Sequence, residues 1–399
     1  MESKITSPHK RPLIVSMAFL FSFTPFFSFY PIQTDLQPIY LIIMGVILLA
    51  NRKYLTKLSM PSFLLLVFSI ISFVYIDPNY FEIIIRQSAG IIAAFLAYTF
   101  YSKYSYYLDQ KLLFLIILIN FIPVFIDYYN PEFFEKILGS FVRVAKSAEG
   151  GRGAAGFSSE PGFIGALGVF YILTSYFLKV KRGDTRYYFI NIFLSLIIVY
   201  MSKSGTGIMY LLIFIFFVFF KIKAKNLISL LCVILLIFLV IEYVDLGRGG
   251  SILKGIFDNT YAIMTTDLSI SHRVINIITG ILSPFEFPFG VGVGGYDRAF
   301  VEINSIYNIT DTFPGKVSNI SAFALYSVEF GIIYLGLMAY FITKSASEVR
   351  KGGFKYLVVA LLFCSSSFSV AFPPVWFIFS ILHKPISKNY SQSKLAGVR

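Results

Sequence analysis

Residues 111–127 read KLLFLIILINFIPVFID, with Lys111 and Asp127 as the charged side chains, one at each end. An apolar run of roughly 17 to 25 residues is long enough, as a helix, to cross the hydrocarbon core of a bilayer. Similar runs recur along the chain, of which 57% is hydrophobic and 14% charged. Soluble domains carry about 25% charged residues, so the sequence predicts an integral membrane protein.

The apolar runs predict an all-α, polytopic transmembrane bundle of about 12 spans, which forms a single membrane domain over residues 1–399. The last two runs flank Pro373 and Pro374 closely enough that they could form one broken segment. The expected helices lie near 13–30, 36–50, 59–76, 82–100, 111–127, 162–178, 187–201, 205–220, 226–243, 320–343, 355–370 and 372–383.

Basic residues fall on every second connection, which predicts the orientation because cytoplasmic loops carry the excess of Lys and Arg. Both termini share that side, so we expect a multi-pass membrane protein with cytoplasmic N- and C-termini. The net charge of +13 follows from this topology rather than from nucleic-acid binding. Acidic loop residues such as Asp35, Asp77 and Asp127 carry little weight for orientation. The basic segments are Arg52-Lys53-Lys57, Lys103-Lys111, Lys179-Lys181-Arg182-Arg186, Lys221-Lys223-Lys225 and Lys344-Arg350-Lys351-Lys355.

The basic start of the chain, Met1 to Pro12, resembles the first part of a signal peptide, but no small-residue cleavage site follows it. We therefore expect a retained first helix. Two connections on the outer side are long, 128–161 and 244–319, and both contain apolar stretches. Loops of this length are usually functional or disordered, and the apolar stretches argue against disorder. The simplest interpretation is that these two connections carry the function, at the outer face of the membrane.

The first long connection ends in GGRGAAGFSSEPGFIGALG (150–168). A structural interpretation has Ser158 or Ser159 capping the next helix, with Pro161 in its first turn and Glu160 favoured by the helix dipole. A functional one makes the same helix start an anion site, which Arg152 joins around a phosphate. The residues alone leave both open.

The second long connection contains SHRVINIITGILSPFEFPFGVGVGGYDR (271–298). Arg273 precedes an apolar stretch that could lie as a helix along the membrane interface, where an arginine is more often an anchor than a catalyst. His272 beside it is most simply a solvated loop residue.

Ionisable residues inside spans are functional hypotheses by default. Arg86 is spaced one turn from Glu82, so a structural salt bridge competes with ligand binding. Glu329 lies about 15 Å along the 320–343 helix and should face protein or a polar cavity. The sequence has no Asp-x-Asp pair in its outer loops, no His-Glu-x-x-His and no Walker or dinucleotide motif, so we expect no metal and no cofactor.

Four segments together resemble the bacterial O-antigen and exopolysaccharide repeat-unit polymerases, members of a superfamily that also contains O-antigen ligases. They cover the chain from Gly150 to Gly336. The segments are GRGAAGFSSEPGF (151–163), SKSGTGIMYLL (202–212), SHR to GVGVGGYD (271–297) and SNISAFALYSVEFGIIYLG (318–336).

This resemblance implies a metal-independent polytopic, GT-C-like glycosyltransferase of the bacterial cytoplasmic (inner) membrane. It would work at the outer, periplasmic face on undecaprenyl-pyrophosphate-linked oligosaccharides. Its partners would be these lipid-linked substrates, membrane lipid and a chain-length regulator (co-polymerase) in the same membrane, with no nucleic acid. Arg152 and Arg273 match the outer-loop arginines of the family, and Glu160 matches its acidic residue before proline; these three are the expected catalytic residues. Arg86, Ser204, His272 and Asn319 are the expected substrate-binding residues.

Ligases of the superfamily place a histidine where this chain has Ser318 and Asn319, which favours a polymerase. An arginine cannot serve as a base because it stays protonated. Glu160 or His272 would have to activate the acceptor hydroxyl, unless electrostatics alone suffice. The alternatives in function are an O-antigen ligase, a lipid-linked oligosaccharide flippase and a scaffold without ligand. The candidate cations gather at one face rather than through the midplane, which disfavours the flippase.

Overall fold

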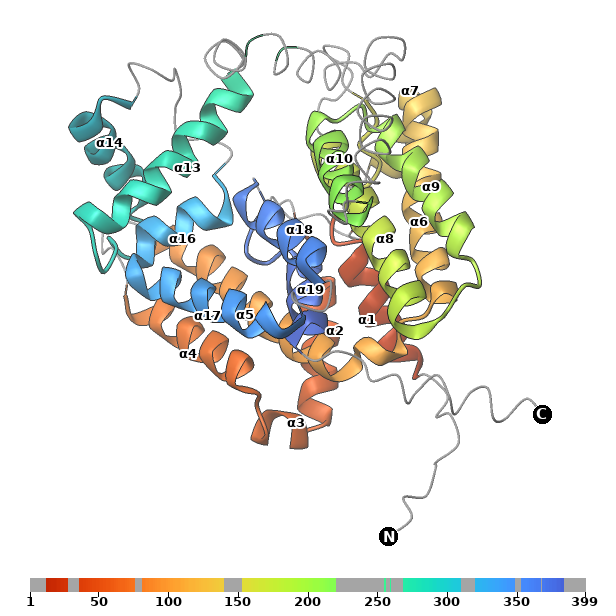
Figure 1. The fold of residues 1–399 in the computed structure, drawn as a ribbon, viewed down its shortest axis with the longest axis horizontal. Coiled ribbons are helices and arrows are strands. Elements are labelled where there is room, and N and C mark those ends of the chain that lie inside the picture. Colours follow the sequence, from red (N-terminus) through yellow and green to blue (C-terminus); the bar gives the residue numbers. More distant parts are fainter. Residues whose placement is uncertain are drawn as a thin grey trace, which may run out of the picture.

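A computed structural model describes residues 12–27, 36–75, 81–139, 153–219, 268–309, 320–348, 353–366 and 368–383, and the isolated residues 255 and 259. Helices account for the regular structure of these residues, and no strand forms among them (Figure 1). The α-helices are α1 (Leu13–Phe23), α2 (Ile39–Ala50), α3 (Lys53–Thr56), α4 (Met60–Val74), α5 (Phe81–Tyr104), α6 (Gln110–Tyr129), α7 (Pro131–Leu138), α8 (Pro161–Arg182), α9 (Tyr188–Met201), α10 (Gly205–Phe219), α13 (Leu268–Glu286), α14 (Tyr296–Tyr307), α16 (Ala322–Phe330), α17 (Ile332–Glu348), α18 (Phe354–Ser365) and α19 (Pro373–His383). A short 3₁₀ turn, Ser105–Tyr107, follows α5.

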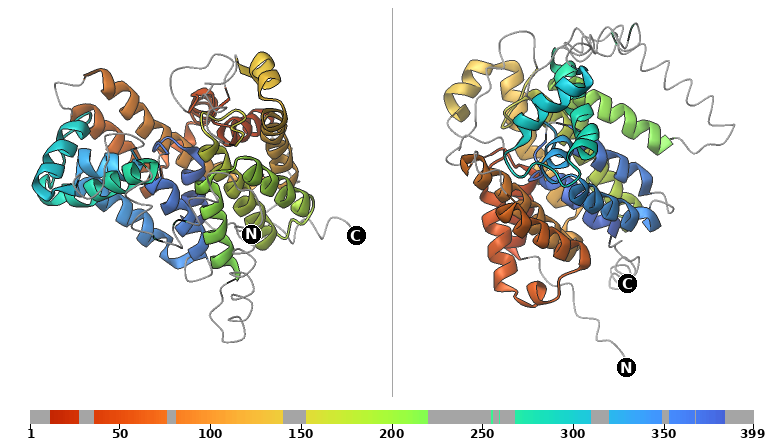
Figure 2. Two further views of the ribbon diagram at one scale, coloured as in Figure 1. Left: turned by 90° about the horizontal axis from the view of Figure 1, so that it is seen from above. Right: turned by 90° about the vertical axis from the view of Figure 1, so that its left-hand side faces the viewer.

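The helix α19 lies at the centre of the molecule, since residues 373–382 are all buried. A helix that is apolar on every side belongs inside a bundle. Aromatic edge-to-face contacts join it to its neighbours: the Phe377 ring packs on Phe23 of α1, Tyr101 of α5 and Phe170 of α8. Figures 1 and 2 show α6 and α8 to α10 on one side of this centre and α4, α5, α13, α14, α16 and α17 on the other.

Most of the predicted spans correspond to helices, but several are shorter than the apolar runs. Within the described residues, α6 and α8 are the two helices long and apolar enough to cross a membrane by length and composition. The other apolar helices have 10–17 residues. The molecule is therefore an all-α protein, and the count of about 12 spans stays a prediction. The predicted helix 226–243 lies outside the described residues.

The predicted helix 320–343 is wrong as a continuous element, because the chain breaks at Gly331 between α16 and α17. Gly331 has a positive φ of 53°, and a Cβ there would lie 2.2 Å from the carbonyl oxygen of Pro288. The amide of Ile332 donates to that same oxygen at 2.8 Å. The turn that follows α13 therefore packs against the chain break at Gly331. The apolar pattern of α16 and α17 does not predict this contact.

The two long connections contain helices of their own. The first holds the end of α6 and α7, and the second holds α13 and α14. Side chains of α13, α14 and α16 form a separate apolar cluster that includes Ile275, Phe300 and Val328. The stretch after Arg273 is helical as expected, but Arg273 lies inside α13 rather than before it. Whether this helix lies along a membrane interface stays a prediction.

Candidate functional site

The Gly153–Glu160 segment folds back onto the end of α6 and onto the turn between α9 and α10. Asp127 holds it: one carboxylate oxygen, Oδ2, accepts the amides of Ala155 at 2.7 Å and Gly156 at 2.9 Å. The amide of Ala154 donates to the carbonyl of Met201 at 3.0 Å. The sequence analysis assigned no role to Asp127, because its partners lie 28 and 29 residues farther along the chain.

Close backbone contacts complete this docking. A Cβ on Gly153 would lie 2.4 Å from the carbonyl carbon and oxygen of Ser202, and one on Gly156 would lie 2.7 Å from a methyl carbon of Val124. Gly156 also has a positive φ of 56°. The glycines of this segment therefore bring its backbone against α6 and the α9–α10 turn.

Glu160 is the N-cap residue of α8, and Pro161 opens the helix as predicted. The predicted serine cap is wrong, because Ser158 bonds instead to the backbone of Glu160: its hydroxyl donates to the Glu160 carbonyl at 2.9 Å. The Glu160 side chain makes no capping hydrogen bond and is partly buried. Its carboxylate is therefore not used to close the start of α8.

Ser204 lies in the α9–α10 turn and is buried. Its hydroxyl accepts the amide of Gly207 at 3.2 Å, so it closes the first turn of α10. A Cβ on Gly207 would lie 2.8 Å from the Cα of Gly165 in α8, which shows how tightly the two helices cross. The predicted substrate-binding role of Ser204 thus has a structural alternative in helix capping.

Arg273 brings α13 to the start of α10. Its Nη1 donates to the hydroxyl of Thr206 at 3.1 Å, and its partly buried side chain has an Nε without a hydrogen-bond partner among the described residues. Tyr210 lies one turn deeper on α10, where its buried hydroxyl donates to the Leu362 carbonyl. A guanidinium carries five N–H donors, so Arg273 can bind an anionic ligand in addition to Thr206.

His272 precedes Arg273 on α13 and is partly buried. Its carbonyl oxygen accepts the side-chain amide of Asn276. Three other predicted site residues cannot be placed in the same way. Arg86 belongs to α5, but its side chain lies outside the described part of the chain, and Arg152 and Asn319 lie outside it altogether.

The 290–295 turn and the end of α16 form a second docked unit. Glu329 is fully buried, and its Oε1 accepts the amide of Gly294 at 2.8 Å. The expectation that Glu329 faces protein is confirmed. The last carbonyls of α16 also accept amides from the turn, those of Val291 and Gly292.

The four segments that carry the family resemblance therefore meet in pairs. The first contacts the second at the α9–α10 turn, where Gly153 lies against Ser202. The third contacts the second at the start of α10 and also contacts the fourth at the end of α16. No protein-family model matches this chain, and no curated protein is significantly similar to it. The resemblance rests on these four segments, and the function that it implies is a proposal.

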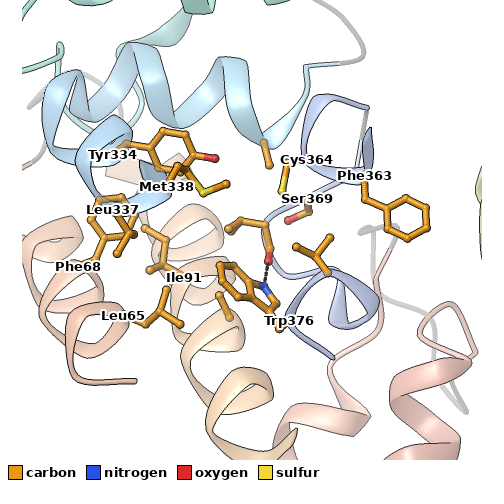
Figure 3. Close-up of a pocket in the computed structure, with 14 residues that line it drawn as sticks. Leu65, Phe68, Ile91, Tyr334, Leu337, Met338, Phe363, Cys364, Ser369 and Trp376 are labelled. Carbon is orange, nitrogen blue, oxygen red and sulfur yellow. Dashed lines mark hydrogen bonds between the residues drawn. The ribbon is translucent and has the colours of Figure 1, made fainter. Parts of the chain in front are cut away.

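A small apolar cavity lies between α4, α5 and α16 to α19 (Figure 3). Leu65, Phe68, Met338 and Cys364 line it, and the indole of Trp376 donates to the Val370 carbonyl at its edge. Its volume of about 10 Å³ admits no more than one water. The cavity therefore gives no polar substrate site. Among the described residues, no group of three or more His, Cys, Asp or Glu side chains could hold a metal ion.

Proposed function

We propose that this chain is a membrane glycosyltransferase that joins lipid-linked oligosaccharide repeat units at the outer face of the cytoplasmic membrane. The observation that carries the proposal is the contact between Arg273 and Thr206. It places a guanidinium with an unsatisfied N–H at the turn onto which the Gly153–Glu160 segment folds. Arg152 directly precedes Gly153 in the sequence, and we propose that its guanidinium joins the same site.

The membrane setting is supported by an inverted distribution of side chains on α9. Phe189 and Phe193 expose 77% and 62% of their surface, whereas Asn191 and Ser195 are fully buried. Water disfavours such a face, and acyl chains favour it. The side chains that face outward on α4, among them Phe73 and Val74, follow the same pattern.

The predicted topology is supported by contacts between connections. Lys181 pairs with Glu348 at 3.2 Å, and both lie on connections predicted to be cytoplasmic. The hydroxyl of Tyr75 donates to the Gly290 carbonyl at 2.8 Å. Tyr75 lies at the predicted periplasmic end of the expected helix 59–76, and Gly290 lies on a connection predicted to be periplasmic. Each of these contacts joins segments expected on the same side of the membrane.

The proposed reaction transfers a glycan from its pyrophosphate carrier to a hydroxyl of a second lipid-linked unit. The anomeric carbon–oxygen bond to the pyrophosphate breaks, the acceptor oxygen forms the new bond, and the electron pair stays on the leaving pyrophosphate. Arg273, and Arg152 with it, would stabilise that developing charge. The acceptor proton would pass to Glu160, whose carboxylate makes no capping bond, or to His272.

Deletion of the gene, followed by gel analysis of surface polysaccharide and of lipid-linked glycans, tests this function. We expect glycolipid that carries one repeat unit and no ladder of longer chains. Long lipid-linked glycan that accumulates beside unmodified lipid core would identify a ligase instead. Repeat units that stay on the cytoplasmic leaflet would identify a flippase.

A further inference from the structure

Glu329 combines complete burial with incomplete hydrogen bonding. Its Oε1 accepts the Gly294 amide, whereas Oε2 is buried without a hydrogen-bond partner in the described part of the chain. The Gln87 side chain of α5 is a polar neighbour of the carboxyl, at a distance longer than a normal hydrogen bond. An apolar side chain of similar size would avoid the desolvation of a buried acid, so packing alone does not account for a glutamate here.

The turn that Glu329 holds is shaped to fit the end of α16. Gly290, Gly292 and Gly294 have φ values of 80°, 86° and 89°, which side chains with a Cβ rarely adopt. The amides of Val291 and Gly292 donate to the carbonyls of Val328 and Glu329 at 3.1 and 3.0 Å. These bonds satisfy carbonyls that a helix leaves open at its C-terminus.

The turn is linked through α14 to α13, and hence to Arg273. Tyr296 opens α14 two residues after Gly294, and its buried hydroxyl donates to the side chain of Asn276. Asn276 lies on α13, three residues after Arg273. Farther along α13, Gly280 allows direct contact with α16, since a Cβ there would lie 2.7 Å from the Cα of Ala324.

We propose that Glu329 is a positioning residue, which holds the 290–295 turn against α16 and thereby sets α13 and Arg273 against the start of α10. For catalysis this inference rests on the proposed function, but the arrangement itself can be measured without any glycan. A guanidinium must stand within a fraction of an ångström of its working position to stabilise a transition state. Glu329 would contribute to the reaction through that placement, without touching the substrate.

Hydrogen exchange of the purified full-length protein in nanodiscs tests the placement. In Glu329→Leu, we expect exchange of residues 290–297 and of the α13 segment 268–286 to rise about tenfold, as for the loss of one buried hydrogen bond. Glu329→Gln keeps an acceptor oxygen and should restore protection of both segments. Glu302→Leu, at an exposed position on α14, is the matched control and should change neither. Unchanged exchange of 268–286 in Glu329→Leu would overturn the inference.

Tyr296→Phe provides a second test, which keeps the ring and removes the hydroxyl bonded to Asn276. It should raise exchange of 268–286 and leave 290–295 protected. If Glu329→Leu does not accumulate in the membrane, this variant still tests the proposed link between the turn and α13. Equal protection of 268–286 in Tyr296→Phe and the unaltered protein would contradict the proposed route to α13.

The link to Arg273 is tested by combining substitutions and measuring polymer formation in proteoliposomes. In the Arg273→Lys background, Glu329→Leu should reduce the rate by a much smaller factor than it does alone, because both changes disturb the same contact. If the rate of the double variant falls by the product of the factors found for the two single substitutions, positioning through Arg273 is contradicted. If exchange changes as expected but Arg273→Ala leaves polymerisation intact, the proposed function fails and the positioning role of Glu329 stands.

Discussion

Two turns predicted to lie on the outer side are each held by a buried carboxylate, but the two anchors differ. Asp127 accepts two amides of the Gly153–Glu160 segment on one oxygen. Glu329 accepts one amide of the 290–295 turn, and its second oxygen is buried without a partner among the described residues. A satisfied anchor stabilises a fold, whereas an unsatisfied buried acid is energetically unfavourable and calls for a further explanation. Asp127 thus holds its segment against α6, whereas the turn held by Glu329 is also joined to α13, through the hydrogen bond between Tyr296 and Asn276.

The comparison requires both turns to lie on the same face of the membrane, and topology reporters test this with an all-or-none result. Reporters fused after Lys57, Arg186 and Lys351 should indicate a cytoplasmic location. Reporters near Gly150 and Val291 should indicate a periplasmic one. If the last two lie on opposite faces, the first and third segments cannot share a site, and the comparison fails.

The next largest effect is expected at Arg273, which joins α13 to the start of α10. Arg273→Ala should lower the polymerisation rate about 10²–10³-fold, or about 2.7 to 4 kcal/mol, by analogy with the loss of an oxyanion donor. Arg273→Lys should recover part of it, because lysine keeps the charge without the bidentate geometry. Arg152→Ala should behave like Arg273→Ala if both arginines hold one pyrophosphate.

Ladder length at matched protein levels measures these effects. Arg298→Ala is the control, since Arg298 is exposed on α14. Normal ladders from both Arg152→Ala and Arg273→Ala would indicate that these arginines act as membrane anchors.

A smaller effect, on stability rather than rate, is expected at Asp127. Asp127→Ala leaves two buried amides without an acceptor, so we expect the free energy of unfolding to fall by about 2 to 4 kcal/mol. Asp127→Asn keeps an acceptor oxygen and should lose less. Thermal unfolding of the purified protein in detergent measures both. A melting temperature of Asp127→Ala equal to that of the unaltered protein would show that the carboxylate does not hold the segment.

The smallest effect is expected where α8 crosses α10. Gly207→Ala places a Cβ 2.8 Å from the Cα of Gly165, and the resulting overpacking should destabilise the protein by about 1 to 3 kcal/mol. Gly45→Ala in α2 is the control, because no atom lies within 4 Å of the added Cβ. It should be neutral or slightly stabilising, since alanine favours helix. Equal melting temperatures for the two variants would indicate that the helices can separate without loss.

Several features of the site could be predicted because they depend on neighbours along the chain. Pro161 opens α8, and the SKSGTG turn separates α9 from α10 as the apolar pattern indicates. The role of Asp127 could not be predicted, because its partners, the amides of Ala155 and Gly156, lie 28 and 29 residues away. The contact between Arg273 and Thr206 spans 67 residues, and no local pattern encodes it.

Hydrophobic periodicity and run length are local properties, and they are enough to predict the all-helical class, most helix positions and a membrane protein. Tertiary structure alone decided which turns are docked and which acids hold them. It also decided that the 320–343 run breaks at Gly331, where the Pro288 carbonyl needs the space of a side chain. Such contacts require that backbone segments far apart in the sequence lie close together. Local sequence patterns do not indicate which segments these are.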